Sequence, residues 1–231
     1  MLYIVSTPIG NLKDISERAL DILRSVEVVI AESPNDSVKL LSAYEIKGKR
    51  IVKFNDRNKK QALGGILEII KNQNCAYISS AGTPGISDPG QDLVDFARRN
   101  GVDVKVIPGP SALISAIAMS GMRARQFTFV SFPPKKQGQL KKLFEEFAGR
   151  KEVLVFFEST HRILKTLAVL AESFNSADVF VAKEMTKIFE NYFQGKPVEI
   201  IEKFEQNPKS TKGEFVIVVD FSSYPKHPES V

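Results

Sequence analysis

The sequence predicts an α/β protein with two α/β domains, the first built on a mostly parallel sheet and the second on a mixed sheet. In the first half, short β-rich apolar runs alternate with amphipathic segments of helical period. This alternation favours a parallel sheet with helices on both faces. The pattern changes after Pro108-Gly-Pro110. We therefore expect a first domain of residues 1–110 and a second domain of residues 111–231.

Five strands and four helices are expected in the first half. An apolar stripe that includes Leu20, Leu23 and Val26 predicts the first helix, and Gly101 ends the last one as a C-cap glycine does. The predicted strands are Leu2–Val5, Val28–Ala31, Ile51–Phe54, Ala76–Ser79 and Val104–Ile107. The predicted helices between them are Ser16–Val26, Ser37–Tyr44, Lys60–Lys71 and Asp92–Asn100.

The second half also mixes strands and helices, with less regular spacing. Its predicted helices are Ala112–Met119, Leu140–Ala148 and His161–Ser173. Its predicted strands are Phe127–Phe132, Glu152–Phe157, Val179–Lys183 and Gly213–Phe221, the last of which is expected to close the sheet. The segment Ile188–Gln194 with Gly195-Lys-Pro197 has the composition of a turn, and Ser222–Val231 that of a frayed tail.

The composition of the 231-residue chain is that of an ordinary globular protein, with 43% hydrophobic and 26% charged residues. The formal net charge of +5 permits an anionic partner without requiring one. Cys75 is the only cysteine, and His161 and His227 are the only histidines. A disulfide within the chain is impossible, and a Cys/His metal site is not expected. No apolar run approaches the length of a membrane span, so we expect a cytoplasmic protein.

Three loops rich in Gly and Pro follow predicted strands of the first half, at Ser6–Asn11, Ser79–Gly90 and Pro108–Ala112. In an open parallel sheet, ligands bind outside the carboxyl ends of the strands, where these loops would meet. A tight connection between strand and helix is the alternative role of each loop. The chain has no phosphate-binding, dinucleotide-binding, zinc-protease or hydrolase-elbow motif. A cofactor without a phosphate group, held mainly by the backbone, therefore fits these loops best.

Six ordered motifs resemble those of the tetrapyrrole methylase superfamily, and within it the bacterial 16S rRNA cytidine 2′-O-methyltransferases. They are Leu2-Tyr-Ile-Val-Ser-Thr-Pro-Ile-Gly-Asn-Leu12, Ala81-Gly-Thr-Pro-Gly-Ile-Ser-Asp-Pro-Gly90, Ile107-Pro-Gly-Pro-Ser-Ala112, Phe156-Phe-Glu-Ser-Thr-His-Arg162, Ala182-Lys-Glu-Met-Thr-Lys187 and Lys212-Gly-Glu-Phe-Val216. The resemblance implies two α/β domains with S-adenosylmethionine (AdoMet) between them. It also implies a homodimer that methylates a cytidine ribose in the decoding region of 16S rRNA.

Some positions depart from this resemblance. The family usually has an acidic residue followed by Asp-Thr-Arg after the second strand, where this chain has Glu32-Ser-Pro-Asn35. Ser80 stands where the family commonly has Asp, and Asn55-Asp-Arg-Asn58 stands where a stretch like His-Glu-His is expected. The sequence also ends soon after the motif that contains Val216. The cofactor loops themselves match the family pattern.

Matching the superfamily motifs assigns AdoMet binding to the three loops. The residues are Pro8, Gly10, Gly82, Thr83, Pro84, Gly85, Ile86, Ser87, Asp88, Pro110, Ser111 and Ala112. The carboxylate of Asp88 could accept hydrogen bonds from ligand hydroxyls. Its alternative role is an Asx turn or a cap before the helix that follows.

A ribose hydroxyl is a weak acid, so a general base would help as its proton leaves. Three carboxylates at predicted strand ends are the candidates, namely Glu158, Glu184 and Glu32. Burial at such a position raises the pKa of a carboxylate, which suits a base. A salt bridge to a neighbouring lysine or arginine is the alternative role of each. Loss of the proton to solvent after methyl transfer also stays open.

The resemblance implies 16S rRNA or the 30S subunit as the partner and no membrane. Basic residues of the second half are expected to contact the RNA phosphates. The candidates for substrate binding are His161, Arg162, Lys183, Lys187, Lys135 and Lys136. Two other functions stay open: a methyltransferase of the same fold that acts on a corrin, porphyrin or other small molecule, and a relative that binds AdoMet or RNA but has lost catalysis.

Overall fold

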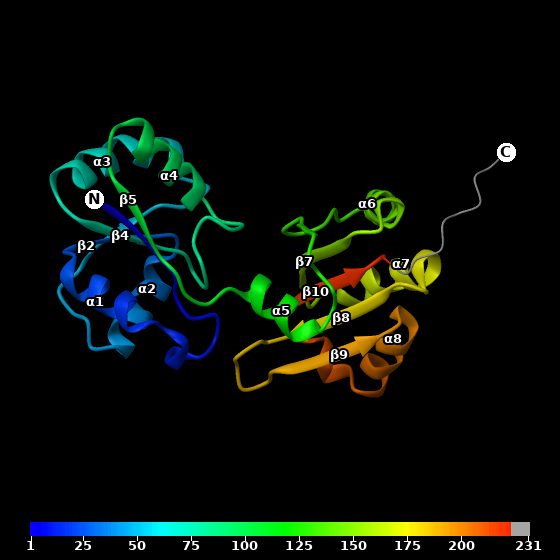
Figure 1. The fold of residues 1–231 in the computed structure, drawn as a ribbon. Coiled ribbons are helices and arrows are strands. Elements are labelled where there is room, and N and C mark those ends of the chain that lie inside the picture. Colours follow the sequence, from blue (N-terminus) through cyan, green and yellow to red (C-terminus); the bar gives the residue numbers. More distant parts are fainter. Residues whose placement is uncertain (223–231) are drawn as a thin grey trace. The chain divides into compact units, whose positions relative to one another are not determined.

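A computed structural model describes residues 1–222, and its chain divides into two compact units, Met1–Ser111 and Ala112–Val231. Each unit contains one five-stranded sheet with helices packed on it (Figure 1). Among the described residues, no helix has the length and apolar character needed to cross a bilayer. The tail expected at Ser222–Val231 lies, from residue 223 onward, outside the described residues.

The sheet of the first unit is entirely parallel, as the alternating pattern predicts. Its strands are β1 (Leu2–Val5), β2 (Val28–Ala31), β3 (Arg50–Lys53), β4 (Cys75–Ile78) and β5 (Val104–Ile107). They lie in the order β3-β2-β4-β1-β5, so β4 is inserted between β2 and β1. Strands β2 and β4 are buried along their whole length, which explains why their sequences are apolar without alternation.

Helices cover both faces of this sheet. They are α1 (Glu17–Ser25), α2 (Pro34–Ala43), α3 (Lys59–Asn72) and α4 (Gly90–Arg99), with a 3₁₀ turn, η1, at Leu12–Asp14. Helices α1 and α2 lie on one face and α3 and α4 on the other (Figure 1). Apolar residues of each pair form a core with the sheet. The helix that follows β4 therefore lies on the opposite face from the helices that follow β2 and β1. This reversal makes the carboxyl ends of β4, β1 and β2 a topological switch point.

The sheet of the second unit is mixed, which also agrees with the predicted fold class. Its strands are β6 (Phe127–Phe129), β7 (Val153–Ser159), β8 (Asp178–Lys183), β9 (Asn191–Gly195) and β10 (Glu214–Asp220). They lie in the order β6-β7-β10-β8-β9, where only the β6–β7 pair is parallel. The last strand in sequence is thus the central strand. The prediction that it closes the sheet was wrong, and the unbroken apolar run Phe215–Val219 fits a strand buried on both faces.

The helices of the second unit are α5 (Ala112–Ser120), α6 (Gln137–Arg150), α7 (Ile163–Phe174) and α8 (Pro197–Gln206), with a 3₁₀ turn, η2, at Pro208–Thr211. Phenylalanines of α6, α7 and α8 form one core with the sheet. Helix α5 contacts β7, β8 and β10. The pairing of the strands places the carboxyl ends of β7 and β8 and the start of β10 at the same end of the sheet.

Two predicted segments of the second unit differ from the structure. Strand β6 ends at Phe129 and not at Phe132, because Ser131 has a left-handed backbone with φ of 56°. The segment expected to be a turn near residues 188–197 contains strand β9 and leads into helix α8. Pro197 is the first residue of α8, and the Glu199 carboxylate accepts from the Lys196 amide, which is one half of a capping box.

Candidate functional site

The three Gly/Pro loops of the first unit are joined by a chain of hydroxyl hydrogen bonds. Ser6, directly after β1, donates its hydroxyl to Thr83 Oγ1 over 3.0 Å. The Thr83 hydroxyl donates in turn to the Pro110 carbonyl after β5, also over 3.0 Å. Thr83 of the middle loop therefore connects the first loop to the third. The prediction that these loops meet at one edge of the sheet is confirmed within this unit.

Backbone contacts reinforce the same arrangement. Thr7 and Gly82 exchange amide-to-carbonyl bonds of 2.9 and 3.1 Å, which pair the first loop with the second. Gly82 has φ of +75°, a conformation that side chains rarely adopt. A Cβ atom on Gly109 would lie 2.9 Å from Ser6 Cβ, so only glycine allows the third loop to approach this closely. The glycines thus let the loop backbones pack closely together. The packed loops have little conformational entropy to lose when a ligand binds.

Asp88 organises the middle loop from within. One carboxylate oxygen accepts from the Gly85 amide at 2.8 Å, and the other accepts from the Gly90 amide at 2.8 Å and the Tyr77 hydroxyl at 3.0 Å. Burial raises the pKa of Asp88 despite these bonds, and burial also raises the pKa of Tyr77. The carboxylate therefore shapes the loop. The exposed residues of this loop are Ser80, Ala81, Ile86 and Ser87.

Glu32 comes to the same edge from the end of β2. Its Oε2 accepts from the amide and the hydroxyl of Ser80, at 2.9 and 2.8 Å. A serine at position 80 can donate to this carboxylate, whereas an aspartate there would repel it. The segment Asn55–Asn58 before α3 closes on itself, because the Asn55 amide donates to Asn58 Oδ1 at 2.8 Å. Two departures from the family pattern are thus locally well bonded.

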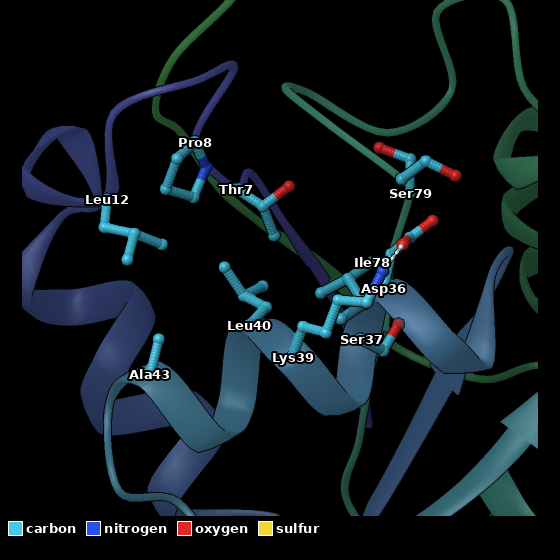
Figure 2. Close-up of a pocket in the computed structure, with 11 residues that line it drawn as sticks. Thr7, Pro8, Leu12, Asp36, Ser37, Lys39, Leu40, Ala43, Ile78 and Ser79 are labelled. Carbon is cyan, nitrogen blue, oxygen red and sulfur yellow. Dashed lines mark hydrogen bonds and ion pairs between the residues drawn. The ribbon is translucent and has the colours of Figure 1, made fainter. Parts of the chain in front are cut away.

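A pocket of about 260 Å³ opens beside these loops, between them and α2 (Figure 2). Its lining residues are Thr7, Pro8, Leu12, Asp36, Ser37, Lys39, Leu40, Ala43, Ile78, Ser79 and Ser80. Only Pro8 was among the predicted site residues. The α2 residues were missed because their pattern is that of any amphipathic helix. The signal for this pocket is the strand order, which places α2 beside the ends of β1 and β4.

In the second unit, Glu158 is a fully buried carboxylate at the end of β7. Its Oε2 accepts from the Thr166 hydroxyl at 2.7 Å and lies 3.3 Å from the Arg162 guanidinium, while Oε1 accepts from the Ser159 amide at 2.8 Å. Arg162 also donates to the carbonyls of Pro133 and Pro134, each at 3.0 Å. This geometry suits a residue that positions Arg162 and the loop before α6.

Glu184 and Lys187 form a second charged cluster at the same edge of this sheet. Glu184 accepts from the Glu214 amide at 2.8 Å and from the Lys187 ammonium at 3.0 Å, and Lys187 also pairs with the Glu214 carboxylate at 2.8 Å. Burial raises the pKa of Glu184, but these donors outweigh burial and hold it below the ordinary range. Burial lowers the pKa of Lys187, yet the two carboxylates raise it overall. A carboxylate held ionised in this way is a weak base.

The structure brings the three motifs of the second unit together. The Thr160 hydroxyl donates to the Gly213 carbonyl at 2.9 Å, and a Cβ on Gly213 would lie 2.6 Å from Glu184 Cγ. Lys183 is nine-tenths buried and donates to the Lys209 carbonyl at 3.3 Å. His161, Lys135 and Lys136 are exposed. The predicted substrate-binding residues thus divide into paired, partly buried side chains and freely exposed ones.

The loops of the first unit fit a small organic cofactor better than a metal ion. Within residues 1–222, no three His, Cys, Asp or Glu side chains come together as metal ligands would. The loops offer rigid main chain and hydroxyls, and the carboxylate of Asp88 is used within its own loop. Close packing around the glycines fits a ligand that is held by backbone groups.

Comparison with known sequences finds one family and relatives that share one name. A family model described as Tetrapyrrole (Corrin/Porphyrin) Methylases matches residues 1–200. A Thermotoga maritima protein named Ribosomal RNA small subunit methyltransferase I is 42% identical over 219 residues, which cover 94% of this chain and 97% of the relative. A protein of the same name from Borrelia garinii subsp. bavariensis is 41% identical over 224 residues, covering 96% and 100%.

Solved structures with the same fold are more distant in sequence. The methyltransferase CobJ superposes with a TM-score of 0.68 at 14% identity, covering 95% of this chain and 93% of that one. The cobalt precorrin-4 methyltransferase CbiF gives a TM-score of 0.65 at 16% identity, covering 97% and 96%. At these identities the likeness establishes the fold, which is the predicted one, and nothing about the substrate.

Proposed function

Because this chain belongs to the tetrapyrrole (corrin/porphyrin) methylase family, we propose that it is an AdoMet-dependent methyltransferase that acts on the ribose 2′-hydroxyl of a cytidine in 16S rRNA. The observation that carries the proposal is the identity of about 40%, over nearly the whole chain, to proteins named Ribosomal RNA small subunit methyltransferase I. The bonded loops of the first unit support it, since they follow the strands at whose ends this fold class binds ligands.

In this proposal the three loops hold AdoMet. AdoMet supplies a methyl group on a positively charged sulfur, which a hydroxyl oxygen can displace in line. The loops contribute by fixing the donor, because correct placement of two reactants alone is worth roughly 7–11 kcal/mol of barrier. Thr83 and Asp88 act indirectly by holding the loop shape, while Ile86 and Ser87 at the exposed tip and Ser111 contact the ligand. That the second unit completes this site stays a prediction.

We propose Glu32 as the general base among the three candidate carboxylates. Glu158 is fully buried and bonded through both oxygens, and the pKa of Glu184 is lowered, so each suits a structural role better. Glu32 is half-buried and lies beside the cofactor loops, where Ser80 holds one oxygen in place. It would accept the proton of the 2′-hydroxyl while the oxygen takes the methyl group and the sulfur keeps the bonding pair.

The second unit is proposed to contact RNA. Exposed Lys135, Lys136 and His161 would meet phosphates directly, whereas Arg162, Lys183 and Lys187 each donate to a neighbouring carbonyl or carboxylate. Phosphate contacts fix the register of a protein on its nucleic acid. An assembled 30S subunit as substrate, a homodimer as the active form and a cytoplasmic location complete the proposal.

Mapping of ribose methylation in 16S rRNA tests the proposal. In a strain that lacks this protein, one cytidine 2′-O-methyl group is expected to disappear and to return with the wild-type chain. The variant Gly82→Arg should not restore it, because φ of +75° and the side chain of Ile9, 3.2 Å from a Cβ atom, exclude a long side chain there. The variant Gly64→Arg should restore it, because nothing lies within 4 Å of a Cβ on that helical glycine.

The same experiment separates the other functions. Unchanged rRNA together with a defect in corrin or porphyrin methylation would favour the small-molecule enzyme. Binding of RNA by purified protein without any methyl transfer would favour the relative that has lost catalysis. For the base, Glu32→Gln should lower kcat at least a hundredfold while the affinity for AdoMet, measured by calorimetry, stays within twofold. Unchanged kcat would assign the proton to solvent.

A further inference from the structure

The pocket between α2 and the loops after β1 and β4 is smaller than a typical cofactor site. Its volume of about 260 Å³ lies below the usual range of roughly 300–1,000 Å³ for sites of drug-sized ligands. A single nucleobase with part of its sugar is much smaller than AdoMet. The pocket lies at the topological switch point of the parallel sheet, where ligands of this fold class bind.

Two contacts fix the walls of this pocket. The Tyr44 hydroxyl, at the end of α2, donates to the Leu12 carbonyl and so ties the 3₁₀ turn η1 to that helix. The bonds from Ser80 to Glu32 tie the loop after β4 to the residues that lead into α2. The pocket is therefore bounded by anchored elements on each side, which is the preorganisation that a binding site requires.

The walls and the rim of the pocket differ in chemistry. The side chains of Pro8, Leu12, Leu40 and Ala43 face a common space (Figure 2). Leu12 is 45% exposed, so its side chain is accessible to a ligand in the pocket. Aliphatic walls of this kind can hold the flat faces of a heteroaromatic ring.

The rim carries a donor and an acceptor side by side. Asp36 and Lys39 form an ion pair of 3.2 Å on one turn of α2. The Ser33 hydroxyl donates to the other Asp36 oxygen at 2.8 Å and fixes that carboxylate. The Watson–Crick edge of cytosine also presents an amino donor next to a ring acceptor. A carboxylate and an ammonium at neighbouring positions complement that edge.

We propose that this pocket binds the base of the acceptor nucleotide, a pyrimidine flipped out of the RNA. The inference rests on the proposed function and deepens it by naming where the substrate base lies. Thr7 lines the pocket and is bonded to Gly82 of the cofactor loop. A base in the pocket therefore places its own ribose beside the loops that hold the methyl donor and beside Ser80, the hydrogen-bond partner of Glu32.

The adenine ring of AdoMet is the other heteroaromatic ring that the enzyme would meet. A variant that fills the pocket distinguishes the two sources. Ala43 lines the pocket at the last position of α2, and Ala43→Phe would place a ring in it. The matched control is Ser42→Phe, because Ser42 precedes Ala43 on the helix, is exposed and is not part of the lining.

The experiment measures transfer of a labelled methyl group to 30S subunits from the deletion strain, and AdoMet affinity by calorimetry. Ala43→Phe is expected to lower kcat/KM for the subunit at least thirtyfold and to leave the affinity for AdoMet within twofold, while Ser42→Phe matches the wild type. A loss of AdoMet affinity in Ala43→Phe would assign the pocket to adenine and overturn the proposal. Wild-type kinetics in Ala43→Phe would also overturn it.

A second variant keeps the test valid if the phenylalanine disturbs folding. Lys39→Met removes the donor from a side chain that is 78% exposed, so the fold is expected to tolerate it. Its KM for the subunit should rise about tenfold with kcat and AdoMet affinity unchanged, and an unchanged KM would count against the base pocket. If the wild-type chain itself methylates no RNA, the proposed function fails first, and the base pocket fails with it.

Discussion

The first unit holds its candidate site with hydroxyls, amides and glycines, whereas the second unit holds its motifs with ion pairs. In the first, Thr83 joins two other loops and Asp88 is bonded to its own loop. In the second, Glu158 holds Arg162, and Glu184 holds Lys187. The first unit thus relies on neutral donors, some of which bond the carboxylates of Asp88 and Glu32, whereas the second unit relies on pairs of opposite charge.

The largest expected effect is the loss of Glu158 from the second unit. Glu158→Ala leaves the Arg162 guanidinium, with 19% of its side chain exposed, without its carboxylate partner. Removing one partner of a buried ion pair typically costs about 3–5 kcal/mol, and we expect a loss of that size in the free energy of unfolding. Urea denaturation followed by circular dichroism measures it. Glu145→Ala, at an exposed position of α6, is the control and should change it by less than about 0.5 kcal/mol.

The corresponding change in the first unit is Gly90→Ala. A Cβ atom there would lie 2.5 Å from Tyr77 Cε1 and 2.7 Å from Asp88 Oδ1. Tyr77 is fully buried, so the loop must move, and overpacking of this kind costs about 1–3 kcal/mol. AdoMet affinity should fall more than tenfold because the displaced loop is the one proposed to bind it. Calorimetry and urea denaturation together measure both losses.

Gly64→Ala is the matched control for that substitution. Gly64 lies within α3, and nothing lies within 4 Å of its added Cβ atom. Alanine is the better helix former, so this variant should gain about 0.5–1 kcal/mol of stability and keep full AdoMet affinity. Equal AdoMet affinity in Gly90→Ala and Gly64→Ala would show that close packing at position 90 does not shape the cofactor loop.

The two units should also differ in the sign of their pH dependence. Burial raises the pKa of Asp88, so the folded state binds this proton more tightly, and the contribution of Asp88 to stability falls as the pH rises above 3.8. At Glu184, hydrogen-bond donors outweigh burial and lower the pKa of the carboxyl. The contribution of Glu184 to stability is therefore present above pH 4.5 and is lost as the pH falls. We expect the wild-type advantage over Asp88→Asn to shrink with rising pH and that over Glu184→Gln to shrink with falling pH. Unfolding free energies from pH 3 to 7 measure both, and parallel trends would contradict the comparison.

The sequence predicts the features that depend on neighbouring residues and misses those that depend on distant segments. Strands β1, β2 and β5 have the predicted bounds, because each is a short apolar run between clear breaks. Strand β9 and helix α8 were missed, although Pro197 at the first helical position was a local signal for the helix. The central place of β10 was missed because strand order depends on pairings between distant segments.

The candidate site shows the same limit. The motifs name Thr83 and Asp88, and the end of a predicted strand names Glu32. Only the structure shows that Asp88 accepts hydrogen bonds within its own loop and that Glu32 is bonded to Ser80. The pocket on α2 is invisible in the sequence, since Leu40 is an ordinary apolar position of an amphipathic helix. Only the order β2-β4-β1 brings that helix to the loops.

The smallest expected effect concerns Ser80, which stands where the family commonly has an aspartate. Ser80→Ala removes one bond, the 2.8 Å donation from the hydroxyl to Glu32, and keeps the amide donation. A loss of about 0.5–1 kcal/mol is expected, as for a single exposed hydrogen bond. Ser80→Asp should cost more than Ser80→Ala, because it adds a like charge beside Glu32. That extra loss should shrink in 1 M salt, where the screening length falls to about 3 Å. Urea denaturation at low and high salt measures the difference. Equal stability of the two variants at low salt would contradict this expectation. It would mean that a like charge at position 80 does not repel Glu32 and that the serine has no electrostatic role there.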